Sequence, residues 1–296
     1  MTRSDVVVAL NANRASGTEA VIRKIGRPSV EGQRVLVKPN LNTADPTPGS
    51  THTDTLRTVV GILKEGNAEE IIVGDRSGPA NTRKVFEEKG IFSLREELGF
   101  GPLIFDEMPL SRFERIRPKN SHWKFGFLFA KPVLEADKVI TLCCLKTHQY
   151  GGHFTMSLKV TTGMVHRRDM IELHMSRKIR QMIAEMNLAY SPELIIMDGV
   201  EAFYRGGPMT GKVWNANLTF ASRDRVALDA VGVAALKTHG TTAEGEKRGI
   251  FEQDQISRAV ELGLGVQTAS EIRVVPADEA SAEVTEQLQG ALTSED

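Results

Sequence analysis

Short apolar runs of strand length recur along the chain, and segments of helix length separate them. In chain order the runs occupy residues 5–10, 34–38, 70–75, 102–106, 138–144, 193–199, 216–222 and 271–275. Strand-length runs that alternate with helical segments are typical of βαβ units. The pattern therefore predicts an α/β fold in which helices cover a mostly parallel sheet on both faces, in a doubly wound, Rossmann-like arrangement.

The segments between these runs predict the helices and the domain organisation. Helices are expected at 18–26, from about Thr53, at 82–98 and at 174–189, where apolar residues recur at helical spacing. Residues 107–131 are less regular and predict an inserted hairpin or small subdomain. The Ala-, Glu- and Ser-rich segment 277–296 predicts a surface helix that fades into disorder. We therefore expect a single α/β domain over residues 1–276.

Composition and charge narrow the class of partner. The 296 residues are 41% hydrophobic and carry a formal net charge of −1, which gives no electrostatic footprint for nucleic acid or an anionic membrane. No apolar stretch reaches the length of a membrane span, and the N-terminus lacks the apolar region of a signal peptide. The only cysteines, Cys143 and Cys144, are adjacent and predict buried strand residues in a reducing cytoplasm. The partner that remains is a small-molecule substrate. A homo-oligomer is also compatible with the sequence.

Polar side chains follow four of the predicted strands. Lys38 and Asn40 follow the second, Asp75 the third, Lys146 and His148 the fifth, and Asp198 the sixth. In an open parallel sheet, ligands bind beyond the carboxyl ends of the strands. Each residue alone is explained equally well as a loop cap or a surface charge. Their joint occurrence favours a binding site at this edge of the sheet.

Two loops extend the predicted site. His52 precedes the helix that begins near Thr53, and it is either a candidate acid or base or an exposed residue without a role in the site. The free N–H groups at the start of that helix would favour an anionic ligand. The segment 205–212, RGGPMTGK, resembles a phosphate-binding loop in composition. Val213 stands where a magnesium-binding Ser or Thr would be, so a glycine-rich flap over the site is the preferred interpretation. Arg205, Gly206 and Gly207 are then candidate substrate contacts.

Residues 146–174 contain four of the seven histidines, namely His148, His153, His166 and His174, together with Lys146 and Lys159. Imidazole is the usual acid or base near neutral pH and a common ligand of transition metals. We expect His166, His174, Asp75 and Asp198 to bind a divalent metal ion. No HExxH or CxxC spacing identifies the ion.

Several segments resemble the bacterial and archaeal domain-of-unknown-function family 362. They are residues 35–42, Thr51-His52, 62–78, 136–148, 155–165, 195–211 and 220–236, and they cover most of the chain in order. Many members resemble iron–sulfur proteins with a cysteine-rich segment. This chain has no such segment, so no iron–sulfur cluster is expected.

Residues 136–174 are also distantly similar to the nickel-pincer lactate racemase family. That resemblance implies that His148 corresponds to the catalytic histidine, Lys159 to the lysine that carries the cofactor, and His174 to a nickel ligand. The glycine-rich sequence before Lys159 departs from the pattern of that family.

These residues favour an enzyme that acts on a small oxygenated or carboxylate-bearing molecule by acid/base chemistry with the help of a metal, as a lyase or isomerase. His148 is the expected acid/base, and Lys38, Lys146 and Lys159 would bind a carboxylate or stabilise an oxyanion. Asp75 and Asp198 would bind the metal or orient other groups. Two alternatives stay open: a non-catalytic protein that binds a metal or an anion, and a redox protein.

Overall fold

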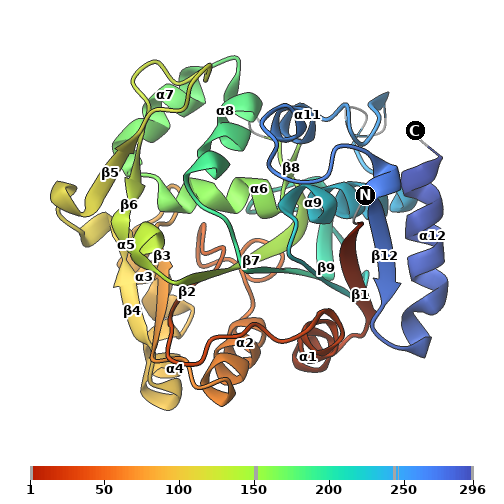
Figure 1. The fold of residues 1–296 in the computed structure, drawn as a ribbon, viewed down its shortest axis with the longest axis horizontal. Helices are drawn as coiled ribbons and strands as arrows, with labels where there is room; N and C mark the ends of the chain where they lie inside the picture. The colour runs from red at the N-terminus through yellow and green to blue at the C-terminus, as the bar shows by residue number, and fades with distance from the viewer. Residues whose placement is uncertain (1–2, 150–152, 243–244, 246, 295–296) are drawn as a thin grey trace.

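The computed structural model describes residues 3–149, 153–242, 245 and 247–294, and its centre is a large, mostly parallel sheet with helices on both faces (Figure 1). Across this sheet the strands run in the order β12-β1-β11-β9-β7-β2-β3-β4, with β10 paired to β9 and β8 to β7. The bounds are β1 Ser4–Leu10, β2 Arg34–Lys38, β3 Glu70–Asp75, β4 Gly101–Ile104, β7 Lys138–Thr147, β8 Phe154–Thr155, β9 Leu194–Gly206, β10 Gly211–Trp214, β11 Leu218–Ser222 and β12 Ile272–Pro276.

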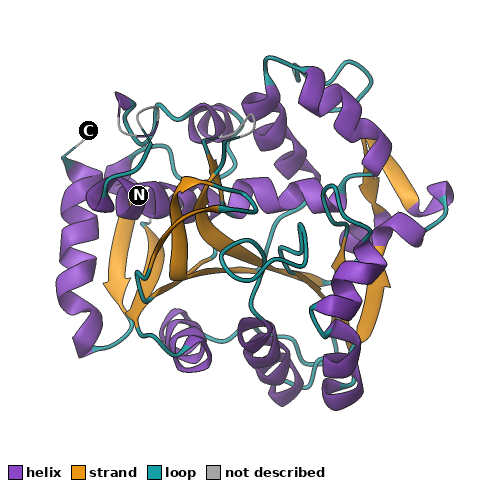
Figure 2. Cartoon of the chain, turned by 180° about the vertical axis from the view of Figure 1, so that it is seen from behind, coloured by secondary structure: helices purple, strands orange, loops and turns teal. Residues whose placement is uncertain are grey.

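The helices cover the two faces of the sheet (Figures 1 and 2). On one face lie α1 Arg14–Ile25, α2 Thr53–Glu65, α3 Thr82–Glu88 and α4 Ile91–Leu98. On the other lie α6 Ser157–Val160, α8 Ile179–Met186, α9 Arg225–His239, α11 Asp254–Glu261 and α12 Ala282–Thr293. Short 3-10 helices occupy Phe105–Glu107, Leu110–Arg112, Thr161–Met164, Arg167–Asp169, Asn187–Ala189, Ala269–Glu271 and Glu279–Ser281.

Burial on both faces explains why the strands read as continuous apolar runs. Along β1, Val6 and Val8 pack into the core with α9, whereas Val7 and Ala9 pack into the core with α1 and α2. A strand covered on both sides has no polar face, so its sequence does not alternate. The predicted α/β class and mostly parallel sheet are confirmed. Three described strands depart from the parallel pattern. The short strands β8 and β10 are antiparallel to β7 and β9. β11 is antiparallel to both β9 and β1, because it follows the β9–β10 hairpin by a short connection.

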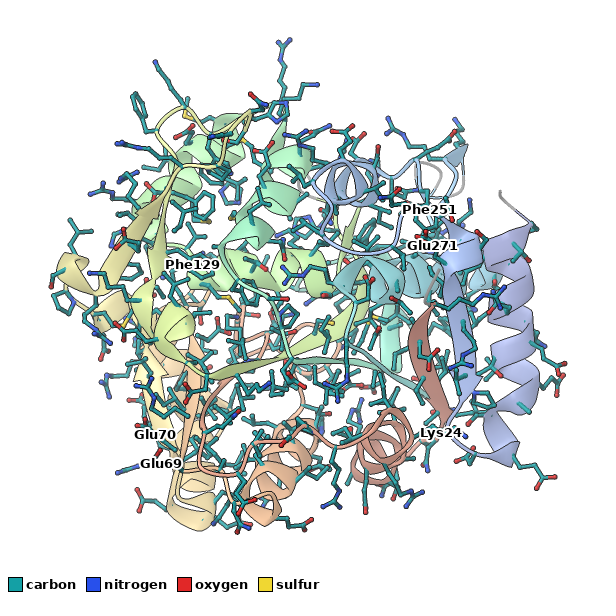
Figure 3. The ribbon with its side chains drawn as sticks, in the orientation of Figure 1. Lys24, Glu69, Glu70, Phe129, Phe251 and Glu271 are labelled. Carbon is teal, nitrogen blue, oxygen red and sulfur yellow. The ribbon has the colours of Figure 1, made fainter. Side chains whose placement is uncertain are left out.

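Residues 107–131 contain a separate two-stranded sheet. β5 Phe113–Ile116 and β6 Phe127–Ala130 pair antiparallel, and α5 Lys131–Glu135 follows them. This hairpin shares a third core with α7 Met170–Met175 and α8, and Figure 3 labels Phe129 of β6 within it. The predicted excursion is therefore a hairpin that packs on the helices after β8.

Two predicted boundaries were wrong. The strand expected at 102–106 ends at Ile104, because Phe105 begins a 3-10 turn. The helix expected at 174–189 consists of α7 and α8, and α7 ends before Ser176. The tail contains a helix, as expected, and Leu288 and Leu292 of this helix, α12, are buried in the main core. Residues 295–296, at the end of the tail, lie outside the described part. In the described segments, every helix is too short or too polar to cross a bilayer.

Candidate functional site

A cavity of about 380 Å³ lies where the loops after β3 and β7 meet α6, α7 and the turn of the β9–β10 hairpin. We call it the main cavity. Its polar side chains include Asn42, Arg76, His148, Lys159, Thr162 and His174. Its apolar wall is formed by Met170, Leu173, Ile179, Pro208 and Met209. No Asp or Glu is among its described lining residues, so the charge of the cavity is positive.

Lys159 supplies an amine to the main cavity. Burial, reinforced by the nearby charges of Lys146 and Arg76, lowers the pKa of Lys159 to about 8. Within the described residues the amine has no hydrogen bond or ion pair. The short helix α6 holds Lys159 in place, because the buried carboxylate of Asp229 accepts from Ser157 N at 2.8 Å and Leu158 N at 3.0 Å at its first turn.

Arg76 contributes a buried guanidinium to the same wall. Its side chain donates to Val165 O at 2.8 Å, Ser77 O at 2.9 Å and Thr162 O at 2.5 Å, and burial lowers its pKa. A guanidinium has five N–H donors, so two remain after these bonds. Since the described residues give Arg76 no carboxylate partner, the group is suited to a carboxylate-bearing ligand.

His148 and His174 both line the main cavity. His174 Nδ1 lies 2.6 Å from Met170 O, and a carbonyl only accepts, so Nδ1 carries the proton and Nε2 is the nitrogen left for a ligand. His148 follows β7, and its backbone N–H donates to His153 O at 3.0 Å. The three residues that the racemase resemblance selects, His148, Lys159 and His174, thus share one cavity.

A buried ion pair lies behind the main cavity. Lys38 Nζ is 2.6 Å from Asp75 Oδ1, and both side chains are 2% exposed. Asp75 also accepts from Leu41 N at 2.7 Å, and burial lowers the pKa of Lys38 against the raising effect of Asp75. A space of about 30 Å³ beside this pair is lined by Lys38, Asn40, Asp75 and Gly163, and it shares Arg76 and Thr162 with the main cavity.

Two predicted residues belong to a different cluster, between α1, α2 and β9. Asp198 accepts from Arg14 Nε at 3.1 Å and from Thr55 Oγ1 at 3.2 Å. His52 caps α2 by accepting from Asp54 N at 3.1 Å, and burial and the charge of Arg14 lower its pKa. Neither residue lines the main cavity.

The remaining predicted residues make contacts that stabilise the backbone or lie at the margin of the main cavity. Lys146 Nζ donates to Gly49 O at 2.6 Å and Pro208 O at 3.2 Å, so it ties the loop before α2 to the hairpin turn. His166 caps a 3-10 turn and packs edge-on against Phe113. Arg205 lies over the ring of Tyr204. Gly206 and Gly207 have positive φ and form the hairpin turn, whose Pro208 and Met209 reach the cavity.

The four predicted metal ligands do not converge, and this part of the prediction needs correction. Asp75 is paired with Lys38, Asp198 with Arg14, and His166 lies at the hairpin, so only His174 lines the main cavity. Among the described residues no group of three His, Cys, Asp or Glu is placed to bind a metal ion. The strand-end argument selected Asp75 and Asp198, but it could not show that neighbouring cations neutralise both carboxylates.

The sequence argument missed four lining residues with polar side chains: Asn42, Arg76, Thr162 and Arg167. Arg76 directly follows a selected strand-end residue, Asp75, and its position was a usable signal. Thr162 and Arg167 lie on irregular backbone after α6, where no periodic pattern indicates which side chains face a cavity.

Three comparisons place the chain among known proteins. The family described as "Domain of unknown function (DUF362)" matches residues 35–234. A thylakoid-associated protein of Synechocystis sp. is 31% identical over 209 residues, which cover 68% of this chain and 62% of that relative. The match thus spans less than two thirds of the relative. The structure of the lactate racemase apoprotein from Thermoanaerobacterium thermosaccharolyticum aligns with a TM-score of 0.50 at 12% identity, over 95% of this chain and 85% of that one, which shows a similar fold.

Proposed function

The chain belongs to the DUF362 family, and from this premise we propose that it is an isomerase- or lyase-type enzyme that moves protons on a small carboxylate-bearing molecule in the main cavity. The observation that carries the proposal is the composition of the cavity. An amine with a pKa of about 8, two imidazoles and a buried guanidinium line it, and its described lining residues include no acidic side chain. A racemase as a distant structural neighbour is compatible with this reaction class.

Arg76 is the expected anchor for the substrate. Two free N–H donors on a planar guanidinium match the two oxygens of a carboxylate, and burial strengthens such a bond. The apolar wall with Met170 and Leu173 suits the short carbon chain of the same molecule. Asn42 and Thr162 offer hydrogen bonds to a hydroxyl or carbonyl oxygen.

Lys159 and His148 are the expected proton-transfer groups. With a pKa of about 8, roughly a tenth of the Lys159 amine is neutral at pH 7 and able to accept a proton. We assign it the removal of a proton from the carbon next to the carboxylate, with Arg76 holding the charge that develops. His148 would return a proton to the same carbon in an isomerase, or protonate a leaving group in a lyase.

A metal-bearing cofactor fits two of these residues. The Lys159 amine has no partner among the described residues, and the racemase resemblance assigns this position to the cofactor. His174 has Nε2 left for a ligand, and the resemblance assigns this position to the metal. When bound there, a divalent ion would polarise an oxygen of the substrate. In that state the Lys159 amine would hold the cofactor, so the proton removal assigned to Lys159 applies to the protein without it.

Deuterium exchange would test the proposal. Purified protein, with and without added nickel or other divalent ions, is incubated in D₂O with a panel of 2-hydroxy acids, and exchange of the proton at C2, the carbon next to the carboxylate, is followed by NMR. We expect exchange with the wild type, and loss of it in Lys159→Met and in His148→Gln. Lys64→Met on the exposed side of α2 is the matched control. Normal exchange in both cavity variants would refute the assignment.

The second candidate is a non-catalytic binding protein, favoured by the same positively charged cavity. It predicts stoichiometric binding of a carboxylate, lost in Arg76→Met, without exchange under any condition tested. The redox alternative requires a coloured cofactor on the purified protein. The expected cytoplasmic location and a possible homo-oligomer stay predictions, which cell fractionation and light scattering would test.

A further inference from the structure

Three exposed apolar side chains mark the outer surface of the hairpin region. Ile171 is 67% exposed and Met175 is 82% exposed on one face of α7, and Phe125 is 60% exposed on the loop 117–126 between β5 and β6. The opposite face of α7 is fixed, because Met170 and Leu173 are buried in the core beneath it. The exposed face is thus presented to solvent in a defined orientation.

The two segments lie side by side at the edge of the molecule. Lys124 N donates to Glu172 Oε1 at 2.6 Å, and Leu128 N donates to Asp169 Oδ2 at 2.7 Å. Both views show α7 next to the hairpin, at one corner of the fold (Figures 1 and 2). We call the surface formed by residues 117–126 and 166–178 the α7 patch.

The α7 patch is strongly basic. Its 23 residues contain seven Lys and Arg against two Asp and Glu, a net charge of +5 in a chain whose net charge is −1. Lys119, Lys124, Arg177 and Lys178 are exposed, and the described residues provide no ion pair for any of them. Several side chains that project at this corner end in nitrogen (Figure 3).

We propose that the α7 patch docks the protein on the surface of a bilayer that contains anionic lipids. Basic side chains are attracted to acidic headgroups, while exposed Phe, Ile and Met side chains insert at the boundary between headgroups and acyl chains. Lys124 Nζ lies 5.1 Å from the centre of the Phe125 ring, so an apolar and a basic group occur at the same point. This inference departs from the expectation of no membrane partner, which rested on a net charge that hides the local excess.

The surface favours lipid over other polyanions. Nucleic acid would use the basic side chains, but Ile171 and Met175 have no stacking surface to offer its bases. A second copy of the same basic surface would be repelled. A bilayer uses both components at once. The α7 patch shares α7 with the wall of the main cavity, which Met170, Leu173 and His174 line, but none of Phe125, Ile171 and Met175 lines the cavity. Substitutions at the exposed positions therefore test docking separately from the proposed chemistry.

Vesicle flotation tests the proposal. The full chain is mixed with vesicles of equal parts phosphatidylglycerol and phosphatidylcholine, or of phosphatidylcholine alone. We expect binding to the first and not to the second, and weaker binding as salt is raised. Arg177→Glu/Lys178→Glu should reduce partitioning at least roughly tenfold, since each basic residue near the surface contributes about fivefold. Ile171→Ser/Met175→Ser should also reduce it, with less dependence on salt.

The matched control is Arg23→Glu/Lys24→Glu, which makes the same change of charge on exposed positions of α1. Figure 3 labels Lys24 on the far side of the view from α7. Unchanged thermal unfolding shows that each variant is folded. The proposal is overturned if the wild type does not float with anionic vesicles, if the control loses as much binding as Arg177→Glu/Lys178→Glu, or if Ile171→Ser/Met175→Ser binds like wild type. Equal competition by single-stranded DNA of the same total charge would also overturn it in favour of a general polyanion surface.

Discussion

Three lysines near the sheet edge have different roles because their partners differ. Lys38 and Lys146 are buried: Lys38 is neutralised by Asp75 at 2.6 Å, and Lys146 donates to two backbone carbonyls. Lys159 is half-buried, has neither kind of partner among the described residues and lines the main cavity. Desolvation lowers the pKa of all three amines, so the missing partner, together with the cavity, distinguishes Lys159 as the amine available for chemistry.

The pH dependence of exchange should report Lys159. Because burial lowers its pKa to about 8, the neutral, basic form increases as pH rises through 8 and is complete above it. We therefore expect kcat/KM for deuterium exchange to rise with pH and to level off above an apparent pKa near 8. Measurement between pH 6 and roughly 9.5 is sufficient. An activity that falls over this range would mean that the protonated amine is the reactive form.

Gly163 is required by the ion pair behind the cavity. A Cβ at this position would lie 2.5 Å from Asp75 Oδ1 and 2.7 Å from Lys38 Nζ. Both atoms are held in a buried pair, so Gly163→Ala should lower the free energy of unfolding by about 1–3 kcal/mol. Gly61→Ala in α2 is the control, since nothing lies within 4 Å of its Cβ and alanine favours a helix. Denaturant unfolding of both variants measures the difference.

Residue types at strand ends could be predicted from sequence, but their partners could not. Lys38, Asp75 and Lys146 lie at or next to the carboxyl ends of β2, β3 and β7, whereas Asp198 is the fifth of thirteen residues in β9, which continues to Gly206. Which of them form ion pairs depends on side chains distant in the chain, such as Arg14 for Asp198. Sequence spacing carries no information on those contacts.

At the scale of elements, α9 positions α6. Asp229 of α9 is fully buried, and its two oxygens accept from two N–H groups at the start of a helix of only four residues. Because a helix of four residues is not stable alone, the contact with Asp229 fixes the segment that carries Lys159. No pattern in the sequence indicates that a residue about seventy positions later caps this helix.

Asp229→Asn tests this positioning. The amide nitrogen cannot accept, so one buried N–H loses its partner, at a cost of about 1–3 kcal/mol. The variant should also show a changed pKa for Lys159 and a lower kcat for exchange. Asp278→Asn, an exposed cap of a 3-10 turn, should leave exchange unchanged.

A second signature of Asp229 is the pH dependence of stability. Burial raises its pKa from 3.8 to about 7. In that window the folded state binds more protons than the unfolded state, so the free energy of unfolding falls as pH rises from about 4 to 7. Asp229→Asn should lose this contribution. An unchanged slope in the variant would mean that Asp229 is ionised throughout.

At the scale of the whole molecule, the hairpin loop and α11 are both tied to α8. The buried carboxylate of Glu185 in α8 accepts from His122 N at 2.9 Å in the hairpin loop and from Arg258 Nη2 at 2.9 Å in α11. Trp123 Nε1 donates to Met182 O at 3.1 Å. The sequence pattern sets the hairpin apart as an excursion, but these contacts join it to the elements around the cavity. We therefore expect residues 3–294 to unfold as one cooperative unit.

Leu288→Ala tests that expectation at the opposite end of the molecule. Leu288 is 2% exposed in the core shared with β1 and α9, so its truncation should lower the free energy of unfolding by about 2–5 kcal/mol. The control is Leu110→Ala, which should change the free energy of unfolding little because Leu110 is half-exposed. The two tryptophans report different regions, Trp123 the hairpin loop and Trp214 the strand β10. In single-tryptophan versions, Leu288→Ala should lower the midpoint of urea unfolding equally at both probes. In a cooperative unit, a substitution in α12 lowers the stability of every part of the fold by the same amount. A shift of the midpoint at Trp214 alone would therefore show that the hairpin unfolds as a separate subdomain.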